Sequence, residues 1–195
     1  MDLRKKIMKW LYPLIMRLSK GTSKGRVLQN EKKASPAQPF YNLSAVLSNG
    51  QPLDMGQFKG KKVLLVNTAS NCGYTGQYEE LQQLHEQHKD QLAIIGFPAN
   101  DFKEQEKDDD QTISQFCQVN FGVTFPLAKK SVVVKDQNQN PVYRWLTQPN
   151  QNGWNGHAPD WNFSKYLLDE NGVLTHYFGP AISPLGEEMQ QALKK

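Results

Sequence analysis

Residues 60–75 read Gly60-Lys-Lys-Val-Leu-Leu-Val-Asn-Thr-Ala-Ser-Asn-Cys-Gly-Tyr-Thr75, and this stretch decides the fold. Its continuous apolar run, residues 63–66, is typical of a strand buried on both faces of a sheet. Thr75 has the chemistry of a helix cap, and the residues that follow predict a helix from about residue 75 to residue 89. The stretch therefore predicts a buried strand, a short loop that carries Cys72, and a helix.

The place of Cys72 predicts a reactive thiol. A cysteine just before a helix faces unpaired backbone N–H groups and the positive end of the helix dipole, and both favour the thiolate. We therefore expect Cys72 to have a depressed pKa. Disulfide exchangers carry a Cys-x-x-Cys pair at such a place, but this chain has Thr75 at the second position. A lone activated thiolate suits attack on a substrate such as a peroxide, and the alternative is a buried, inert cysteine.

The composition sets the broad class of the protein. The chain has 195 residues, of which 38% are hydrophobic, and this length fits one globular domain with a substantial core. Two cysteines, Cys72 and Cys117, do not make a disulfide scaffold. His85 and His88 fit the solvated face of a charged helix, and no His/Cys cluster has metal-ligand spacing. With no glycine-rich phosphate loop either, we expect neither a metal nor a bound cofactor.

Charge is divided unevenly along the chain. Residues 1–33 contain ten Lys or Arg and two acidic residues, a net charge of +8. The overall charge is +4, so the rest of the chain carries −4. The basic character therefore belongs to the N-terminal extension, and binding of nucleic acid by the acidic body is disfavoured.

Residues 1–20 are predicted to form a basic amphipathic helix, which Pro13 is expected to kink. The apolar stretch is too short and interrupted to span a bilayer, and Lys9 interrupts what would be the apolar core of a secretory signal. Contact with an anionic membrane surface fits this helix, while docking on its own domain and a disordered tail are the alternatives. Residues 21–38 are predicted to be a linker. The predicted apolar side of the helix contains Leu3, Ile7, Trp10, Leu11, Leu14 and Leu18, and the basic side contains Lys5, Lys9 and Arg17.

The rest of the chain, residues 39–195, is predicted to be one α/β domain. Residues 40–47 and 51–54 form a β-hairpin across Ser-Asn-Gly50. The order that follows is βαβ, then further helices and strands, and last a β-hairpin and a helix. A cysteine after the first buried strand of the βαβ unit points to a thioredoxin-like fold, with a central mixed sheet flanked by helices. After residue 68, strands are predicted over 92–97, 131–134, 162–168 and 173–178, and helices over 110–120, 141–146 and from about 184.

Four motifs in this domain resemble those of the glutathione peroxidase family. The resemblance covers about residues 39–194, and the four motifs occur in the order that the family has. They are Val66-Asn-Thr-Ala-Ser-Asn-Cys-Gly-Tyr-Thr75, Gly96-Phe-Pro-Ala-Asn-Asp-Phe-Lys-Glu-Gln-Glu106, Phe116-Cys-Gln-Val-Asn-Phe-Gly-Val-Thr-Phe-Pro126 and Trp161-Asn-Phe163.

The resemblance implies a site. The family's peroxidatic cysteine or selenocysteine falls on Cys72, its activating glutamine on Gln105, and its tryptophan and asparagine on Trp161 and Asn162. The two amides and the indole N–H can donate hydrogen bonds to a thiolate, which favours the charged form. Without the family, Gln105 would be assigned to solvent, Trp161 to the core and Asn162 to a turn.

Cys117 matches the resolving cysteine of the two-cysteine, thioredoxin-dependent members. A disulfide with Cys72 requires the two Cα atoms to come within about 7 Å, so the predicted helix around Cys117 would have to unwind or shift. The alternative is that Cys117 serves only as a small apolar residue on the buried face of that helix. Many members have a cysteine where this chain has Ala99, so Cys117 is the one internal partner available to Cys72.

The resemblance implies a thiol peroxidase that reduces hydrogen peroxide and organic or lipid hydroperoxides without a cofactor. Thioredoxin is the expected reductant and glutathione the alternative; a peroxide sensor that oxidises a partner protein is the rival from another class. The short segment between Tyr143 and Trp161 resembles the monomeric members. We expect a cytoplasmic monomer, with peripheral membrane contact through residues 1–20 as an open question.

Overall fold

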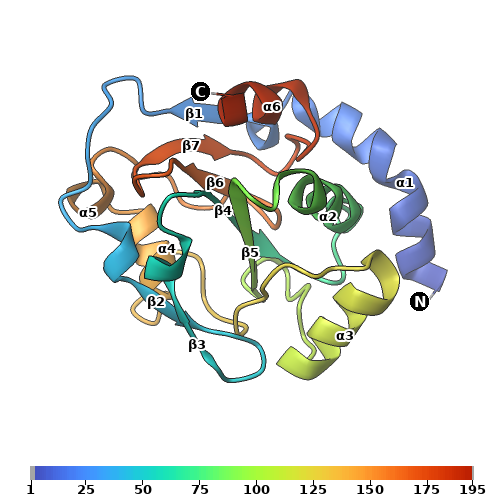
Figure 1. Ribbon diagram of the computed structural model, residues 1–195. Coiled ribbons are helices and arrows are strands. Elements are labelled where there is room, and N and C mark those ends of the chain that lie inside the picture. Colours follow the sequence, from blue (N-terminus) through green and yellow to red (C-terminus); the bar gives the residue numbers. More distant parts are fainter. Residues whose placement is uncertain (1–2, 195) are drawn as a thin grey trace.

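The computed structural model describes residues 3–194, with side chains described from residue 10 onward. A five-stranded sheet in the order β1-β7-β6-β4-β5 forms the centre, and a separate two-stranded sheet pairs β2 with β3 (Figure 1). The strands are β1 (Val27–Gln29), β2 (Ser44–Val46), β3 (Pro52–Asp54), β4 (Lys62–Thr68), β5 (Leu92–Pro98), β6 (Lys165–Leu168) and β7 (Leu174–Phe178). The central sheet is mixed, because β4 and β5 are parallel while the other pairs are antiparallel.

Helices cover both faces of this sheet. Alternate residues of β4 enter two different cores: Leu64 and Val66 pack with α2, α3 and α6, whereas Val63 and Leu65 pack with α4 and the β2–β3 hairpin. Such double burial explains the continuous apolar run of this strand. Figure 1 shows the two groups of helices on opposite sides of the sheet. The helices are α1 (Leu3–Lys20), α2 (Gln77–His88), α3 (Asp110–Phe121), α4 (Pro141–Leu146), α5 (Pro149–Asn152) and α6 (Glu187–Lys194), with short 3₁₀ turns η1 (Ser23–Gly25), η2 (Phe40–Asn42) and η3 (Met55–Phe58).

The strand directions bring distant segments to one edge of the sheet. β4 and β5 are parallel, so the loops after both strands leave from the same edge. β6 is antiparallel to β4, with Val66 opposite Lys165, so the residues before β6 lie at that edge as well. By the same rule β7 ends there and β1 begins there, since Val27 is paired with Phe178. We call this side the Cys72 edge, because the loop that carries Cys72 follows β4 there.

Most predicted elements are confirmed, but the strand predicted over 162–168 begins only at Lys165, and three further details were wrong. Residues 131–134 are not a strand: Val132 makes an isolated bridge to Gln139, while the N–H of Val133 donates to the Asp101 carboxylate at 2.7 Å. Thr75 does not cap α2, which begins after Gly76. The third error is the linker predicted over residues 21–38, which contains β1. β1 was missed because it is a three-residue edge strand with little apolar patterning.

α1 is a continuous helix that includes Pro13 and lies along the outside of the molecule beside α2 (Figure 1). Its Tyr12 hydroxyl donates to the Glu80 carboxylate at 2.7 Å, and Lys20 pairs with Glu188 at 2.6 Å. Tyr12, Ile15 and Met16 pack against the core. In the structure this helix is therefore docked on its own domain, which was one of the alternatives that the sequence left open. Leu3, Lys5, Ile7 and Lys9 lie outside the residues whose side chains are described.

Candidate active site

Cys72 lies in the tight loop between β4 (Lys62–Thr68) and α2 (Gln77–His88), at the Cys72 edge. The N–H of Thr75 donates to the Cys72 carbonyl at 3.2 Å, and the N–H of Gln77 donates to the Tyr74 carbonyl at 2.9 Å. These turns lead directly into α2. Gly76 is required at their end, because a Cβ there would lie 2.6 Å from the ring of Tyr12. The loop therefore fixes the position of Cys72, whose side chain is buried.

Four groups act on the sulfur of Cys72 in favour of the thiolate. They are the backbone N–H of Tyr74, the side chains of Trp161 and Asn162, and the positive charge of Lys24. Burial acts in the opposite direction and is the largest effect, so the pKa of the Cys72 thiol is raised above its ordinary value. The predicted depressed pKa was wrong in direction, because the sequence identifies hydrogen-bond donors but not the degree of desolvation.

Trp161 and Asn162 reach Cys72 from the turn that precedes β6. The N–H of Phe163 donates to the Asn67 carbonyl at 2.6 Å, and Asn67 Nδ2 donates to the Trp161 carbonyl at 3.0 Å. Phe163 has a φ of +67°, in the left-handed region that a bulky residue rarely adopts. The turn is thus tied to β4 on both sides of Asn162, which positions its amide close to Cys72.

Gln105 is at the same edge, but it contacts Asn162. Asn162 Nδ2 donates to Gln105 Oε1 at 2.9 Å, and the Gln105 carbonyl accepts from the N–H of Asn71 at 3.0 Å. The preceding residues Lys103 and Glu104 both have φ near +50°, which produces the sharp turn that brings Gln105 back toward the Cys72 loop. The structure thus places Gln105 as a support for Asn162, whereas the sequence predicted a direct donor to the sulfur.

Glu106 is a buried carboxyl group next to this cluster. Its Oε2 accepts from the N–H of Ser70 at 2.8 Å and from the Ser70 hydroxyl at 3.0 Å, while its Oε1 is buried without a partner. Burial raises the pKa of Glu106 to about 7, and the two hydrogen bonds only partly oppose that effect. The sequence analysis missed Glu106, because an acid in a charged stretch is normally exposed.

Cys117 is in the last turns of α3 and faces the core. Both cysteines are free. Burial raises the pKa of Cys117 to about 12; the neighbouring Tyr78 side chain lowers it, while the charge of Glu106 raises it further. Gly122 ends α3 with a φ of +66°, and its N–H donates to the carbonyls of Cys117 and Gln118. In this structure Cys117 is therefore an apolar core residue in a capped helix.

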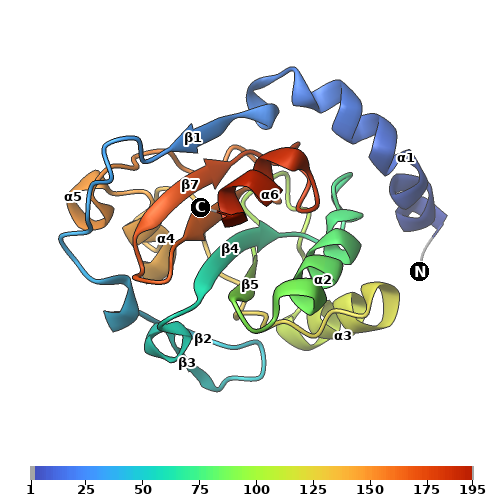
Figure 2. The ribbon, with the colours of Figure 1, turned by 45° about the horizontal axis from the view of Figure 1, so that its top comes forward.

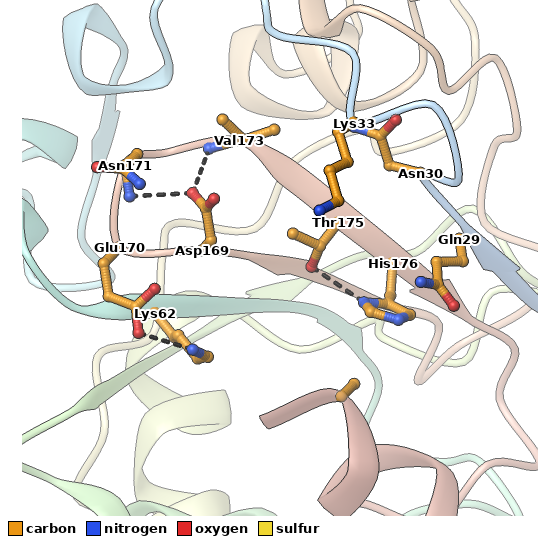
Figure 3. Close-up of a pocket in the computed structure, with 11 residues that line it drawn as sticks. Gln29, Asn30, Lys33, Lys62, Asp169, Glu170, Asn171, Val173, Thr175 and His176 are labelled. Carbon is orange, nitrogen blue, oxygen red and sulfur yellow. Dashed lines mark hydrogen bonds and ion pairs between the residues drawn. The ribbon is translucent and has the colours of Figure 1, made fainter. Parts of the chain in front are cut away.

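A cavity of about 540 Å³ lies elsewhere, between β1, the β6–β7 turn and α6 (Figure 3). Its polar lining is largely paired: Lys62 contacts Glu170 at 2.6 Å, and Asp169 accepts from the N–H groups of Asn171 and Val173. Cys72, Cys117, Gln105, Trp161 and Asn162 do not line it. The cavity is therefore separate from the predicted site.

In the described part of the chain, every helix is too short or too polar to cross a bilayer.

A family model and known protein sequences relate this chain to one protein family. Residues 40–147 match the family model described as glutathione peroxidase. A "Glutathione peroxidase" of Lactococcus lactis is 42% identical over 157 residues, covering 80% of this chain and 98% of that protein. The "Glutathione peroxidase-like peroxiredoxin HYR1" of Saccharomyces cerevisiae is 43% identical over 159 residues, covering 80% and 97%.

Solved structures are also similar to this chain. The crystal structure of T. cruzi GPX1 superposes with a TM-score of 0.61 at 28% identity and covers 80% of this chain and 95% of that one. A thioredoxin family protein from Chlorobium tepidum, described as a thiol:disulfide interchange protein, superposes with a TM-score of 0.57 at 15% identity, covering 82% and 97%. The second likeness confirms the thioredoxin-like fold. The chain belongs to the glutathione peroxidase family and is a peroxidase that reduces hydroperoxides through a cysteine.

Proposed function

We propose that Cys72 is the cysteine that reduces the hydroperoxide. Its thiolate attacks one peroxide oxygen, the O–O bond breaks, and Cys72 becomes a sulfenic acid. The other oxygen leaves as an alkoxide or hydroxide and takes up a proton to give alcohol or water. The observation that supports this role is the convergence of the Tyr74 N–H, Trp161 and Asn162 on one sulfur.

The same groups can serve two steps. Before attack they stabilise the thiolate against the cost of its burial. During attack, donors close to the sulfur can stabilise the departing oxygen as negative charge develops on it. Gln105 acts through Asn162 in this scheme, because the bond from Asn162 Nδ2 to Gln105 Oε1 orients the amide.

We propose further that Cys117 resolves the sulfenic acid. Its thiol condenses with the sulfenic sulfur, forming the Cys72–Cys117 disulfide and releasing one water molecule. Cys117 must leave its buried place on α3 for this step, so the last turns of the helix have to open. A thioredoxin-like dithiol then reduces the disulfide by thiol exchange and is itself oxidised to a disulfide. The name of the yeast relative, a glutathione peroxidase-like peroxiredoxin, supports a peroxiredoxin type of cycle.

The decisive experiment compares reductants. Wild-type protein should consume hydroperoxide continuously with thioredoxin and thioredoxin reductase, and much more slowly with glutathione alone. After peroxide treatment without reductant, peptide mass analysis should find Cys72 linked to Cys117. Faster turnover with glutathione would identify the glutathione-dependent alternative. Oxidation of Cys72 without turnover by either reductant would favour the peroxide sensor.

We propose that the outer face of α1 contacts anionic membranes. Trp10, Leu14 and Leu18 are 79%, 54% and 70% exposed and are spaced four residues apart, so they form one apolar stripe. Arg17 is exposed on the same helix. The opposite face is occupied by docking on α2 and α6, so an apolar stripe with an adjacent cation, Arg17, is left for an anionic surface. A helix held in this way would bring lipid hydroperoxides close to Cys72.

Vesicle co-sedimentation tests the membrane contact. The triple variant Trp10→Ala, Leu14→Ala, Leu18→Ala keeps Tyr12, Ile15 and Met16 and should lose most binding to anionic vesicles at low salt. Val119→Ala is the matched control, because Val119 is an equally exposed apolar residue on α3. Equal binding by the triple variant and the wild type would show that α1 serves docking alone.

We also propose that the protein is a monomer in the cytoplasm. Light scattering of the purified protein tests the first part, and fractionation of the source cells tests the second. The division of the chain at residue 38 stays a prediction, which limited proteolysis can test by the site of the first cut.

A further inference from the structure

The strand order brings one residue of the N-terminal extension to Cys72. β1 begins at the Cys72 edge, because Val27 is paired with Phe178 at the end of β7. The residues just before β1 therefore lie where the residues just before β6 lie, beside Trp161. Figure 2 shows the chain passing from α1 into β1 along this side of the molecule. Lys24 is in η1, the short turn between those two elements.

The backbone of Lys24 is firmly held. Its N–H donates to the Thr22 hydroxyl at 3.2 Å, and its carbonyl accepts from the N–H of Ala181 at 2.8 Å. The chain passes so close to Gly179 that a Cβ on that glycine would lie 2.3 Å from the Lys24 oxygen. Contacts on both sides of the turn thus fix where the side chain of Lys24 begins.

The ammonium of Lys24 lies over the two aromatic side chains that flank Cys72. Lys24 Nζ is 5.0 Å from the ring centroid of Trp161 and 5.9 Å from that of Tyr74, distances at which the ring faces attract a cation. Among the described charged side chains, Lys24 is the one whose charge acts on Cys72, and it favours the thiolate. Tyr74 is the other titratable group that interacts electrostatically with the thiol. Lys103 Nζ also lies over Trp161, at 5.8 Å.

We propose that Lys24 is an electrostatic positioning residue of the peroxidase, through which the extension stabilises the thiolate of Cys72. This inference rests on the proposed role of Cys72. The physical reason is that burial opposes the charged form, and a cation held close to the sulfur offsets part of that effect. Lys24 lies outside residues 40–147, which match the family model, so this contribution is supplied by a segment that the model does not cover. The two rings attract the ammonium, and the Trp161 side chain also acts on the sulfur in favour of the thiolate.

The test measures the pH dependence of Cys72 alkylation by iodoacetamide, a neutral reagent, with mass analysis of the Cys72 peptide. Lys24→Gln and Lys24→Met should both raise the midpoint by about 0.5–1 pH unit, and Lys24→Arg should restore it. At neutral pH, oxidation of Cys72 by hydrogen peroxide should slow by about three- to tenfold in both neutral variants. Added salt should reduce the difference from the wild type, because the partly exposed charge is screened.

Lys32→Gln is the matched control. It removes the same charge from the extension at the other end of β1, and Lys32 is exposed. Lys103→Gln removes the second cation over Trp161 and should shift the midpoint less than Lys24→Gln. An unchanged midpoint in the two neutral Lys24 variants, a shift in only one of them, or an equal shift in Lys32→Gln would overturn the proposal. Failure of the proposed function would appear differently, as undiminished turnover in Cys72→Ser, while the alkylation midpoint would still report on Lys24.

Discussion

The two cysteines of this protein are both buried, yet their surroundings differ. Cys72 is 1% exposed and Cys117 is 0% exposed, and burial raises the pKa of each. Cys72 is in a loop at the Cys72 edge, where the Tyr74 N–H, Trp161, Asn162 and Lys24 favour its thiolate. Cys117 is inside a helix, where the Tyr78 hydroxyl favours the thiolate and the charge of Glu106 opposes it. Exposure therefore does not separate the two thiols, whereas the groups directed at each sulfur do.

The difference supports the proposed order in which the two cysteines react. The thiol with more stabilising groups can ionise without rearrangement of the fold and can attack first. The other thiol needs α3 to open before it can react, and that opening also removes the burial that raises its pKa. A disulfide between them is thus a consequence of local unfolding in the proposed cycle.

The largest expected effect is that of Cys72→Ser, which should abolish peroxidase turnover with any reductant, because the serine hydroxyl is not ionised at neutral pH and is a poor nucleophile toward peroxide. Steady-state peroxide consumption measures this, and circular dichroism checks that the variant is folded. Turnover at the wild-type rate would remove Cys72 from the mechanism and leave Cys117 as the alternative.

Cys117→Ser should lose thioredoxin-supported turnover but still reduce about one equivalent of peroxide per chain. The reason is that attack by Cys72 does not involve Cys117, whereas disulfide formation does. Rapid mixing with one equivalent of peroxide, followed by mass analysis for a sulfenic acid, checks the first part. If this variant cycled normally with thioredoxin, the two-cysteine mechanism would be wrong.

Removal of single donors at Cys72 should have an intermediate effect. Trp161→Phe keeps an aromatic ring but removes the N–H, and it should slow oxidation of Cys72 by about tenfold, the value of one hydrogen bond to a charged group. Asn162→Ala should do the same, and Gln105→Ala should do so less, since it acts through Asn162. Stopped-flow oxidation rates at several pH values measure these effects. Rates equal to the wild type in all three variants would contradict the assigned roles.

Glu106→Gln should change stability in a pH-dependent way. Because the folded-state pKa of Glu106 is raised to about 7, the folded protein binds more protons than the unfolded chain between about pH 4.3 and pH 7. Stability therefore falls as the pH rises through this window, and above it the ionised carboxylate is a net cost. Glu106→Gln removes that cost, so its advantage over the wild type should grow from near zero at about pH 4 to as much as about 3 kcal/mol at about pH 8.

Urea denaturation at several pH values measures this difference, with Asp110→Asn as a control at a less buried acid of α3. The same variant should lower the pKa of Cys117, because the charge of Glu106 raises it. Glu106→Gln thus reduces the difference between the electrostatic surroundings of the two cysteines. A pH-independent difference in stability would mean that Glu106 titrates normally in the folded protein.

The sequence by itself was sufficient to predict the fold class and to recognise the motifs. The apolar runs of β4 and β5 are continuous because both faces are covered, and such runs can be recognised without a structure. Cys72, Trp161 and Asn162 were found as matches to family motifs, and the structure brings them together at one edge. They meet there because β6 is antiparallel to β4, which is itself parallel to β5. The loop after β4 and the turn before β6 therefore lie on the same side of the sheet.

Tertiary structure alone decided the contributions that depend on packing and on long-range pairing. The contact of Gln105 with Asn162, the burial of Glu106 and the raised pKa of Cys72 depend on how completely other segments exclude water. The pairing of β1 with β7 brings Lys24 to Trp161 across 137 positions of sequence. Composition and periodicity describe local preference, whereas desolvation and the electric field at a sulfur depend on every segment that surrounds it. The sequence therefore determined which residues could do the chemistry, and the packed structure decided how each of them acts.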